Sequence, residues 1–270
     1  MAYSISLHIG LNKIDKKHYG SDYPLEGCIN DAKDMLAIAK QKQYDESYIL
    51  IDEAGTYENV TGHLAAAAKK LKKGDIFFIT YSGHGAYVPD TNKDELDGKD
   101  ETWCLFDRMI LDDELAKYWS KFKTGVRIFM ISDSCHSGTV SRAIKSDGTL
   151  DDSLETLRTR LIKNGPKIFA KHKSLYNNAS SSNVAAGKNN IKAAVILLSG
   201  CQDNQTSLDG DKNGLFTEKM LKVYKKGKFT GNYAQLLREI LKLMPSNQTP
   251  NYYLSGVRNI SFESSRPFEK

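Results

Sequence analysis

A histidine and a cysteine occur in this sequence shortly after two apolar segments. Residues 76–81 lead into His84, and residues 126–131 lead into Cys135. A thiolate attacks a carbonyl carbon once a base has taken the thiol proton, and an imidazole is a suitable base near neutral pH. If the two segments are neighbouring strands, Cys135 and His84 face one cleft as a nucleophile with its base.

The oxyanion produced by such an attack needs backbone N–H donors aimed at it. The glycines beside His84 allow close approach of the backbone, so the amides of Gly85 and Cys135 are candidate donors. In the structural alternative, Cys135 is a small buried apolar residue and His84 a hydrogen-bonded core histidine. His136 is a second candidate base because it adjoins the thiol, although successive residues leaving a strand point in different directions.

The elements that must position these residues follow from hydrophobic periodicity. Short apolar segments predict strands at 5–9, 48–51, 76–81, 126–131 and 193–198. Amphipathic patterns predict helices at 30–41, 57–71, 112–122, 215–225 and 233–244. Apolar strands that alternate with helices favour an α/β fold whose mostly parallel sheet is covered on both faces. Active sites of such sheets lie at the carboxyl ends of the strands.

The length of 270 residues suits a single domain, 1–270. Mixed charge and small polar residues predict an exposed linker at about 142–192, with one helix at 154–162. The net charge of +5 is spread without a dominant basic tract, so no nucleic-acid partner is expected.

The four cysteines, Cys28, Cys104, Cys135 and Cys201, follow neither a zinc-binding nor a disulfide spacing. Free thiols are therefore expected, which fits a reducing compartment. We see no leader pattern and no apolar stretch of about 20 residues, so a cytoplasmic chain without a membrane partner is expected.

The two segments that carry His84 and Cys135 resemble motifs of the metacaspases and their bacterial relatives, the orthocaspases, within the caspase-like cysteine peptidases. These motifs are Tyr81-Ser82-Gly83-His84-Gly85 and Asp133-Ser134-Cys135-His136-Ser137-Gly138. Asp133-Ser134 replaces the Gln-Ala that precedes the cysteine in caspases, which indicates the metacaspase branch. Similar segments at 27–32, 94–101, 112–115 and 199–203 extend the resemblance over most of the chain.

The resemblance implies a caspase-like, mostly parallel six-stranded sheet flanked by helices on both faces. It implies Cys135 as nucleophile and His84 as general base and acid. It also implies that the pocket for the residue before the cut bond is lined by Cys28, Asp31, Ser82 and Asp133. Carboxylates there favour Arg or Lys and repel Asp. For Asp31, simple capping of the first long helix is the alternative role.

Many metacaspases need calcium, and the resemblance makes Asp100, Asp112 and Asp113 candidate ligands. Carboxylate oxygens suit this hard cation. Arg142 stands where the family pattern has an aspartate. Ordinary solvated surface carboxylates are therefore the alternative interpretation.

We therefore expect a monomeric cysteine endopeptidase that cleaves protein or peptide substrates after Arg or Lys. Such an enzyme is also expected to cut itself within 142–192, which offers Arg158, Arg160, Lys163, Lys167, Lys171 and Lys173. The main alternative is a catalytically silent caspase-like interaction module. A third, a thiol-dependent acyl hydrolase or transferase, lacks any recognisable cofactor loop.

Overall fold

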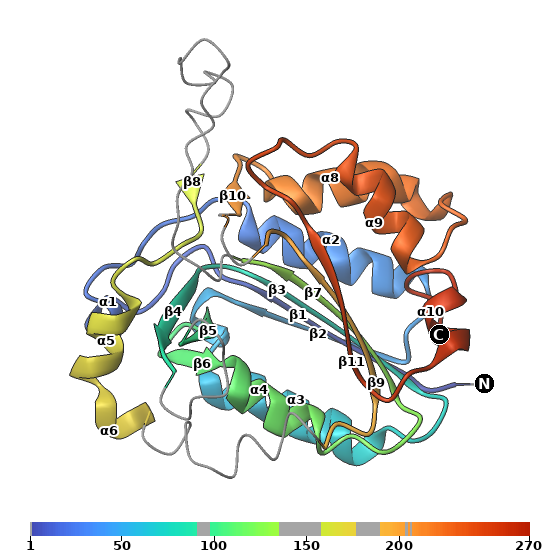
Figure 1. Ribbon diagram of the computed structural model, residues 1–270, viewed down its shortest axis with the longest axis horizontal. Coiled ribbons are helices and arrows are strands. Elements are labelled where there is room, and N and C mark those ends of the chain that lie inside the picture. The colour runs from blue at the N-terminus through green and yellow to red at the C-terminus, as the bar shows by residue number, and fades with distance from the viewer. Residues whose placement is uncertain (1, 91–97, 135–157, 177–189, 203–204, 206) are drawn as a thin grey trace.

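The computed structural model describes residues 2–90, 98–134, 158–176, 190–202, 205 and 207–270. Its centre is a sheet with strand order β11-β9-β7-β3-β1-β2 (Figure 1). The strands are β1 (Ser4–Gly10), β2 (Glu46–Ile51), β3 (Ile76–Ser82), β7 (Arg127–Asp133), β9 (Ala194–Ser199) and β11 (Asn251–Gly256). The first five run parallel, and β11 runs antiparallel to its neighbour β9.

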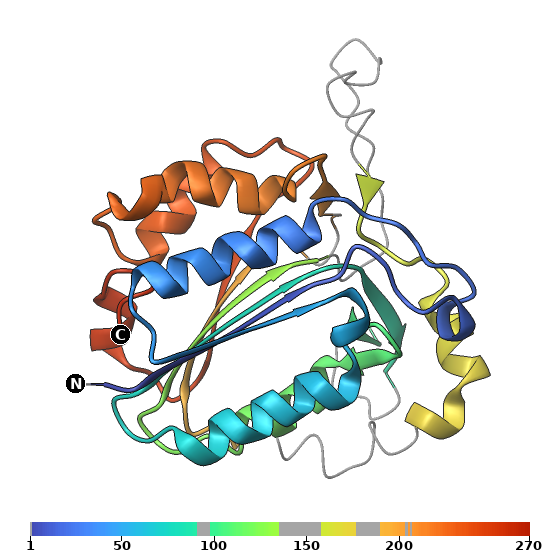
Figure 2. The same cartoon turned by 180° about the vertical axis from the view of Figure 1, so that it is seen from behind.

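Helices cover both faces of this sheet (Figures 1 and 2). One face carries α2 (Cys28–Gln41), α8 (Leu215–Tyr224), α9 (Tyr233–Leu241) and α10 (Ile260–Ser264), and the other carries α3 (Tyr57–Lys70) and α4 (Asp112–Trp119). Successive side chains of a strand point to opposite faces, so Phe77 packs in the core with α3 and α4, and Phe78 packs with α2 and α8. β3, β7 and β9 read as nearly continuous apolar runs because both of their faces are buried.

A smaller antiparallel sheet continues from the carboxyl end of β3 and contains β4 (Gly85–Pro89), β5 (Lys99–Cys104) and β6 (Met109–Leu111). Three short helices pack around its core: α1 (Lys16–Tyr19), α5 (Gly165–Lys171) and α6 (Lys173–Tyr176). A separate antiparallel pair joins β8 (Arg158–Thr159) to β10 (Leu208–Asp209). Two 3₁₀ helices occupy Asp52–Ala54 and Lys225–Gly227.

The predicted mostly parallel, six-stranded α/β architecture with helices on both faces is confirmed, and the five strands expected from periodicity coincide with β1, β2, β3, β7 and β9. Periodicity missed β11. This strand pairs only with β9 at the edge of the sheet, and most of its residues are exposed. An edge strand of this kind needs no continuous apolar run, so its sequence lacks the expected signal.

The expectation of an exposed linker with a helix at 154–162 is wrong for the part that the structure describes. Residues 158–162 are extended, and Arg160 and Ile162 are fully buried. Ile168 and Phe169 of α5 are also buried, against the small sheet. The polar composition misled the prediction because Arg160 is buried through ion pairs, which hydrophobic periodicity does not register.

In the described part of the chain, no helix is both long and apolar enough to cross a membrane. Cys28, Cys104 and Cys201 are buried free thiols, as the cysteine spacing predicted. Cys135, His136 and Arg142 lie outside the described residues.

Candidate active site

The described parts of the two motifs lie side by side at the carboxyl edge of the main sheet. β3 pairs in parallel with β7, and the register sets Ser82 opposite Asp133. His84 follows two residues after Ser82, in the connection between β3 and β4. In sequence, Cys135 follows two residues after Asp133. The approach of Cys135 to His84 stays a prediction.

The orientation of His84 leaves one ring nitrogen available as a base. Its Nε2 lies 2.7 Å from the backbone carbonyl oxygen of Tyr23. A carbonyl oxygen only accepts, so Nε2 carries the hydrogen and Nδ1 of the neutral ring holds the lone pair. Nδ1 is buried and has no hydrogen-bond partner among the described residues. The edge of the Tyr23 ring packs against the imidazole and fixes its position further.

Burial lowers the pKa of His84 below the ordinary 6.5, and the hydrogen bond to the Tyr23 carbonyl acts against this shift. The imidazole is consequently neutral at pH 7. A neutral, oriented imidazole is the form that can accept a thiol proton.

We expect the acid limb of kcat/KM for a peptide substrate to have its midpoint below pH 6.5. Because burial disfavours the imidazolium form, the neutral base persists at lower pH, and activity declines only as the pH falls through the lowered pKa. A kcat/KM profile measured from about pH 4.5 to about pH 8 checks this. An acid midpoint above that of an ordinary histidine would contradict the assignment.

An aromatic pair supports the loop that carries His84. The Tyr81 hydroxyl lies 2.6 Å from the carbonyl oxygen of His84 and 2.9 Å from that of Cys104, both within donating distance. Trp103 stacks on the Tyr81 ring at 4.6 Å between centroids. A Cβ at Gly83 would come within 2.7 Å of the Tyr81 hydroxyl oxygen, so this position needs glycine.

A second cluster at this edge gathers three carboxylates around one arginine. Asp31 comes from α2, Asp133 from the end of β7 and Asp209 from β10. Arg160 Nη2 donates to Asp31 Oδ2 at 2.9 Å and to Asp209 Oδ1 at 2.7 Å. Arg160 Nη1 lies 3.1 Å from Asp133 Oδ1 and also donates to Ser82 Oγ at 2.9 Å. We call these four partners, Asp31, Ser82, Asp133 and Asp209, the acidic pocket.

The start of α8 supplies further donors to the acidic pocket. The backbone amide of Gly214 donates to Asp31, and the amide and hydroxyl of Thr217 donate to Asp133 Oδ2. Such charge-assisted bonds offset the cost of burying the carboxylates. A Cβ at Gly214 would lie 2.4 Å from Arg160 Nη2, so only glycine lets this turn approach so closely.

The helix-capping alternative for Asp31 is not supported. Its carboxylate accepts hydrogen bonds from Arg160, Ser82, Asn213 and Gly214. These donors lie far away in sequence from α2, so the carboxylate serves a tertiary cluster.

The charges of the acidic pocket favour a positively charged side chain between the carboxylates. Burial raises the pKa of Asp31 to about 6 and the Asp133 charge adds to this, whereas the Arg160 guanidinium opposes it. Burial disfavours the charged form of Arg160, but Asp133, Asp31 and Asp209 more than compensate and raise its pKa well above the ordinary value. At pH 7 the acidic pocket therefore carries excess negative charge.

Cys28 begins α2, and its Sγ lies 4.0 Å from Asp209 Oδ1. Burial raises the pKa of its thiol, so Cys28 is protonated at neutral pH. It borders the acidic pocket as a neutral side chain, which agrees with a lining position and with no nucleophilic role.

The amide of Gly85, one of the two predicted oxyanion donors, is occupied. It donates to the backbone carbonyl oxygen of Arg160 at 2.9 Å. The guanidinium of the same residue fills the acidic pocket. Arg160 therefore places its side chain among the carboxylates and its backbone carbonyl at the Gly85 amide, next to His84.

The candidate calcium ligands come from two elements. Asp100 lies in β5, and Asp112 and Asp113 begin α4. Within the described ranges, no three His, Cys, Asp or Glu side chains are grouped so that they could hold a metal ion. Calcium binding therefore stays a prediction.

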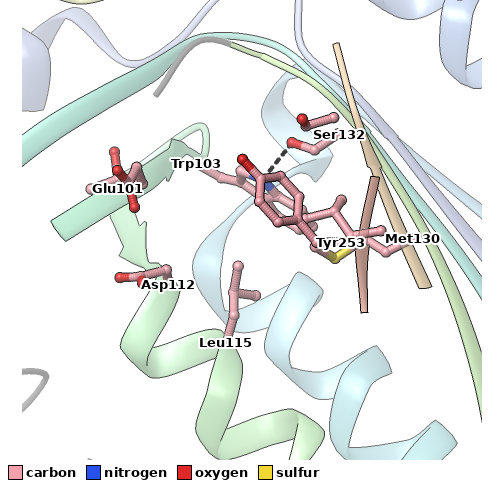
Figure 3. Close-up of a pocket in the computed structure, with 10 residues that line it drawn as sticks. Glu101, Trp103, Asp112, Leu115, Met130, Ser132 and Tyr253 are labelled. Atoms are coloured by element: carbon pink, nitrogen blue, oxygen red, sulfur yellow. Dashed lines mark hydrogen bonds between the residues drawn. The ribbon is translucent and has the colours of Figure 1, made fainter. Parts of the chain in front are cut away.

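A cavity of about 250 Å³ lies near the active-site edge, between α4 and the ends of β5, β7 and β9 (Figure 3). Trp103 forms one wall and donates through Nε1 to Ser132 Oγ at 2.9 Å. Leu115, Met130 and Tyr253 also line the cavity. The cavity contains neither His84 nor the acidic pocket, and we assign it no catalytic role.

Sequence reasoning missed Asp209, Tyr23 and the position of Arg160. Asp209 lies in Ser207-Leu208-Asp209-Gly210-Asp211, whose composition is typical of an exposed turn. Tyr23 contributes only a backbone carbonyl, which no side-chain pattern can reveal. Arg160 was considered only as an exposed residue of the linker.

Comparisons with known proteins show the family of this chain. The family model described as Caspase domain (Peptidase_C14) matches residues 12–260. Metacaspase-1 of Schizosaccharomyces pombe is 30% identical over 88% of this chain and 64% of its own length. The chain spans between 50% and 64% of the length of the curated metacaspases named Metacaspase-1 that it matches.

Solved structures show the same fold. The crystal structure of protein GSU0716 from Geobacter sulfurreducens is 40% identical, covers 99% of this chain and 98% of its own, and superposes with a TM-score of 0.87. Caspase-1 from Spodoptera frugiperda is only 10% identical but covers 100% of this chain and 90% of its own, with a TM-score of 0.60. The second likeness concerns the fold alone.

Proposed function

Since the chain belongs to the caspase-domain family of peptidases, we propose that it is a cysteine endopeptidase that cleaves protein or peptide chains after Arg or Lys. The observation that carries the specificity is the burial of the Arg160 guanidinium among Asp31, Asp133 and Asp209. A fully buried cation is costly unless each of its charges and donors is matched. The acidic pocket provides that match at both terminal nitrogens of Arg160, although Nε has no partner among the described residues, and the pocket would repel a carboxylate.

The proposed chemistry uses His84 and Cys135 together. Nδ1 of His84 takes the thiol proton, and the thiolate adds to the carbonyl carbon of the residue held in the acidic pocket. The amides of Gly85 and Cys135 donate to the resulting oxyanion. His84 returns the proton to the leaving amine, and water then hydrolyses the acyl-enzyme.

Incubation of the purified protein with peptides that carry Arg or Lys before a fluorogenic amide tests this function. We expect turnover of both peptides, and a loss of about 10⁴-fold to 10⁶-fold in Cys135→Ala because the nucleophile is removed. Cys104→Ala is the matched control, since the Cys104 side chain is a buried free thiol in the core of the small sheet. An inert wild-type chain would favour the silent interaction module, and equal turnover by Cys135→Ala would remove the thiol from the mechanism.

A further inference from the structure

Trp103 contacts both of the strands that lead to the catalytic motifs. It lies in β5 and is almost fully buried. Its indole N–H donates to Ser132 Oγ at 2.9 Å, in the strand before Cys135 (Figure 3). Its ring stacks on the ring of Tyr81, in the strand before His84, at 4.6 Å between centroids. One side chain therefore contacts the supports of both the proposed nucleophile and the proposed base.

The contact with Ser132 extends toward the cysteine motif. Ser132 Oγ lies 2.9 Å from Ser134 Oγ, and Ser134 is the residue before Cys135. An indole nitrogen only donates, so the Ser132 hydroxyl accepts from Trp103 and can direct its own hydrogen at Ser134. Both serines are buried, so these bonds are shielded from water. A chain of hydrogen bonds thus connects Trp103 to the residue before the proposed nucleophile.

The end of β7 is held from both faces of the sheet. Successive residues of a strand point to opposite faces. Ser132 points toward Trp103, whereas Asp133 accepts from the amide and hydroxyl of Thr217 at the start of α8. The acidic pocket and the contact with Trp103 therefore lie on different faces. A change at Trp103 is expected to act on the reaction and to leave binding in the acidic pocket nearly unchanged.

The contact with Tyr81 extends toward the histidine motif. The Tyr81 hydroxyl lies 2.6 Å from the His84 carbonyl oxygen. The backbone amide of Cys104, which follows Trp103 in β5, donates to the same oxygen at 2.9 Å. The loop that carries His84 is therefore tied to β5 at two points, through the ring of Trp103 and through the neighbouring amide.

We propose that Trp103 is a positioning residue of the peptidase reaction, which holds the end of β7 and the loop of His84 in a fixed relative position. This inference rests on the proposed function. Transfer of the thiol proton to His84 needs hydrogen-bond distance between the two groups. A displacement of about 1 Å can cost about 10²-fold in rate, even when the change lies away from the reacting atoms. Trp103 acts through Ser132 and Tyr81 and transfers no proton itself.

The variant Trp103→Phe keeps a ring for the stack on Tyr81 and removes the N–H donor. We expect kcat for an Arg peptide to fall by about 10-fold to 100-fold, with KM within about twofold of wild type. We express kcat per active site, titrated to completion with an irreversible peptide chloromethyl ketone that ends in arginine, so that loss of folded enzyme does not contribute.

Trp119→Phe is the matched control. Trp119 is the second of the two tryptophans of the chain, and it packs against Phe122 in the core beside α4. No printed contact joins it to Ser132 or Tyr81 in the described part of the chain. Its replacement is expected to change kcat by less than about twofold, because distant sites act independently.

Two variants of Ser132 separate positioning from a general loss of packing. Ser132→Ala is expected to lose at least as much kcat as Trp103→Phe, and Ser132→Thr, which keeps the hydroxyl, to stay within about threefold of wild type. The cavity that Ser132 lines has room for the added methyl group. Since Trp103 acts through this hydroxyl, Trp103→Phe should add less than about twofold to the loss in Ser132→Ala.

Each outcome decides one claim. Full kcat in Trp103→Phe, or a loss that appears in KM alone, overturns the positioning role and leaves the peptidase function standing. Ser132→Thr as slow as Ser132→Ala, or losses that multiply in the double variant, also overturns it. If Trp103→Phe does not fold, the comparison of the two Ser132 variants decides. An inert wild type contradicts the proposed function itself.

Discussion

Replacement of His84 by alanine is expected to lower kcat for an Arg peptide by roughly 10⁴-fold to 10⁶-fold. The imidazole is the only described group at this edge that combines a free lone pair at Nδ1 with an orienting bond, from Nε2 to the Tyr23 carbonyl. Without it the thiol keeps its proton near neutral pH. Single-turnover kinetics, together with the rate of Cys135 alkylation by iodoacetamide, measure the two parts of this effect.

The matched control is His136→Ala, which removes the imidazole adjacent to the thiol in sequence. We expect kcat within about threefold of wild type, because ordinary substitutions outside a proton-transfer path have small effects. If His136→Ala causes the larger loss, the base has been assigned to the wrong histidine. If both variants keep full activity, neither His84 nor His136 alone is the general base.

Replacement of Asp133 by asparagine is expected to lower kcat/KM for an Arg peptide by about 10²-fold to 10⁴-fold. Loss of one partner from a buried ion pair typically costs about 3–5 kcal/mol. The asparagine oxygen can still accept from Thr217, but an amide NH₂ then meets the Arg160 guanidinium or the Ser207 hydroxyl. The residue held in the acidic pocket therefore loses a charge partner and gains a competing donor.

The same measurement on Asp211→Asn is the control for Asp133→Asn. Asp211 is exposed in the loop that follows β10, so its replacement should change kcat/KM by less than about twofold. The ratio of activity on an Arg peptide to that on a matched neutral peptide does not depend on the amount of folded enzyme. An unchanged ratio in Asp133→Asn would exclude Asp133 from substrate recognition.

The sequence predicts those parts of the molecule that are marked by a local pattern, such as an apolar run or a short motif. The strands β3 and β7 are visible as apolar runs because both of their faces are buried, and the two motifs follow them directly. Resemblance to the metacaspases then singled out Asp31, Ser82 and Asp133, and the structure brings all three to the Arg160 guanidinium. Their role in substrate binding stays a proposal.

The remaining features depend on contacts between distant parts of the chain. Arg160 and Asp31 are 129 positions apart, and Asp209 reaches the same guanidinium from β10. A buried arginine in a polar segment has the composition of a solvated one, so no periodicity marks it. The helix predicted for 154–162 failed for the same reason, since the conformation of 158–162 is set by Ser207 and Gly85.

We propose that the carboxylates of the acidic pocket select a positively charged residue before the cut bond. The most direct test compares kcat/KM of the wild-type protein for two peptides that differ only in arginine or citrulline, its uncharged isostere, at that position. Arginine is expected to be preferred by at least about 100-fold, since the uncharged citrulline cannot form ion pairs with the carboxylates. Equal cleavage of the two peptides would contradict it.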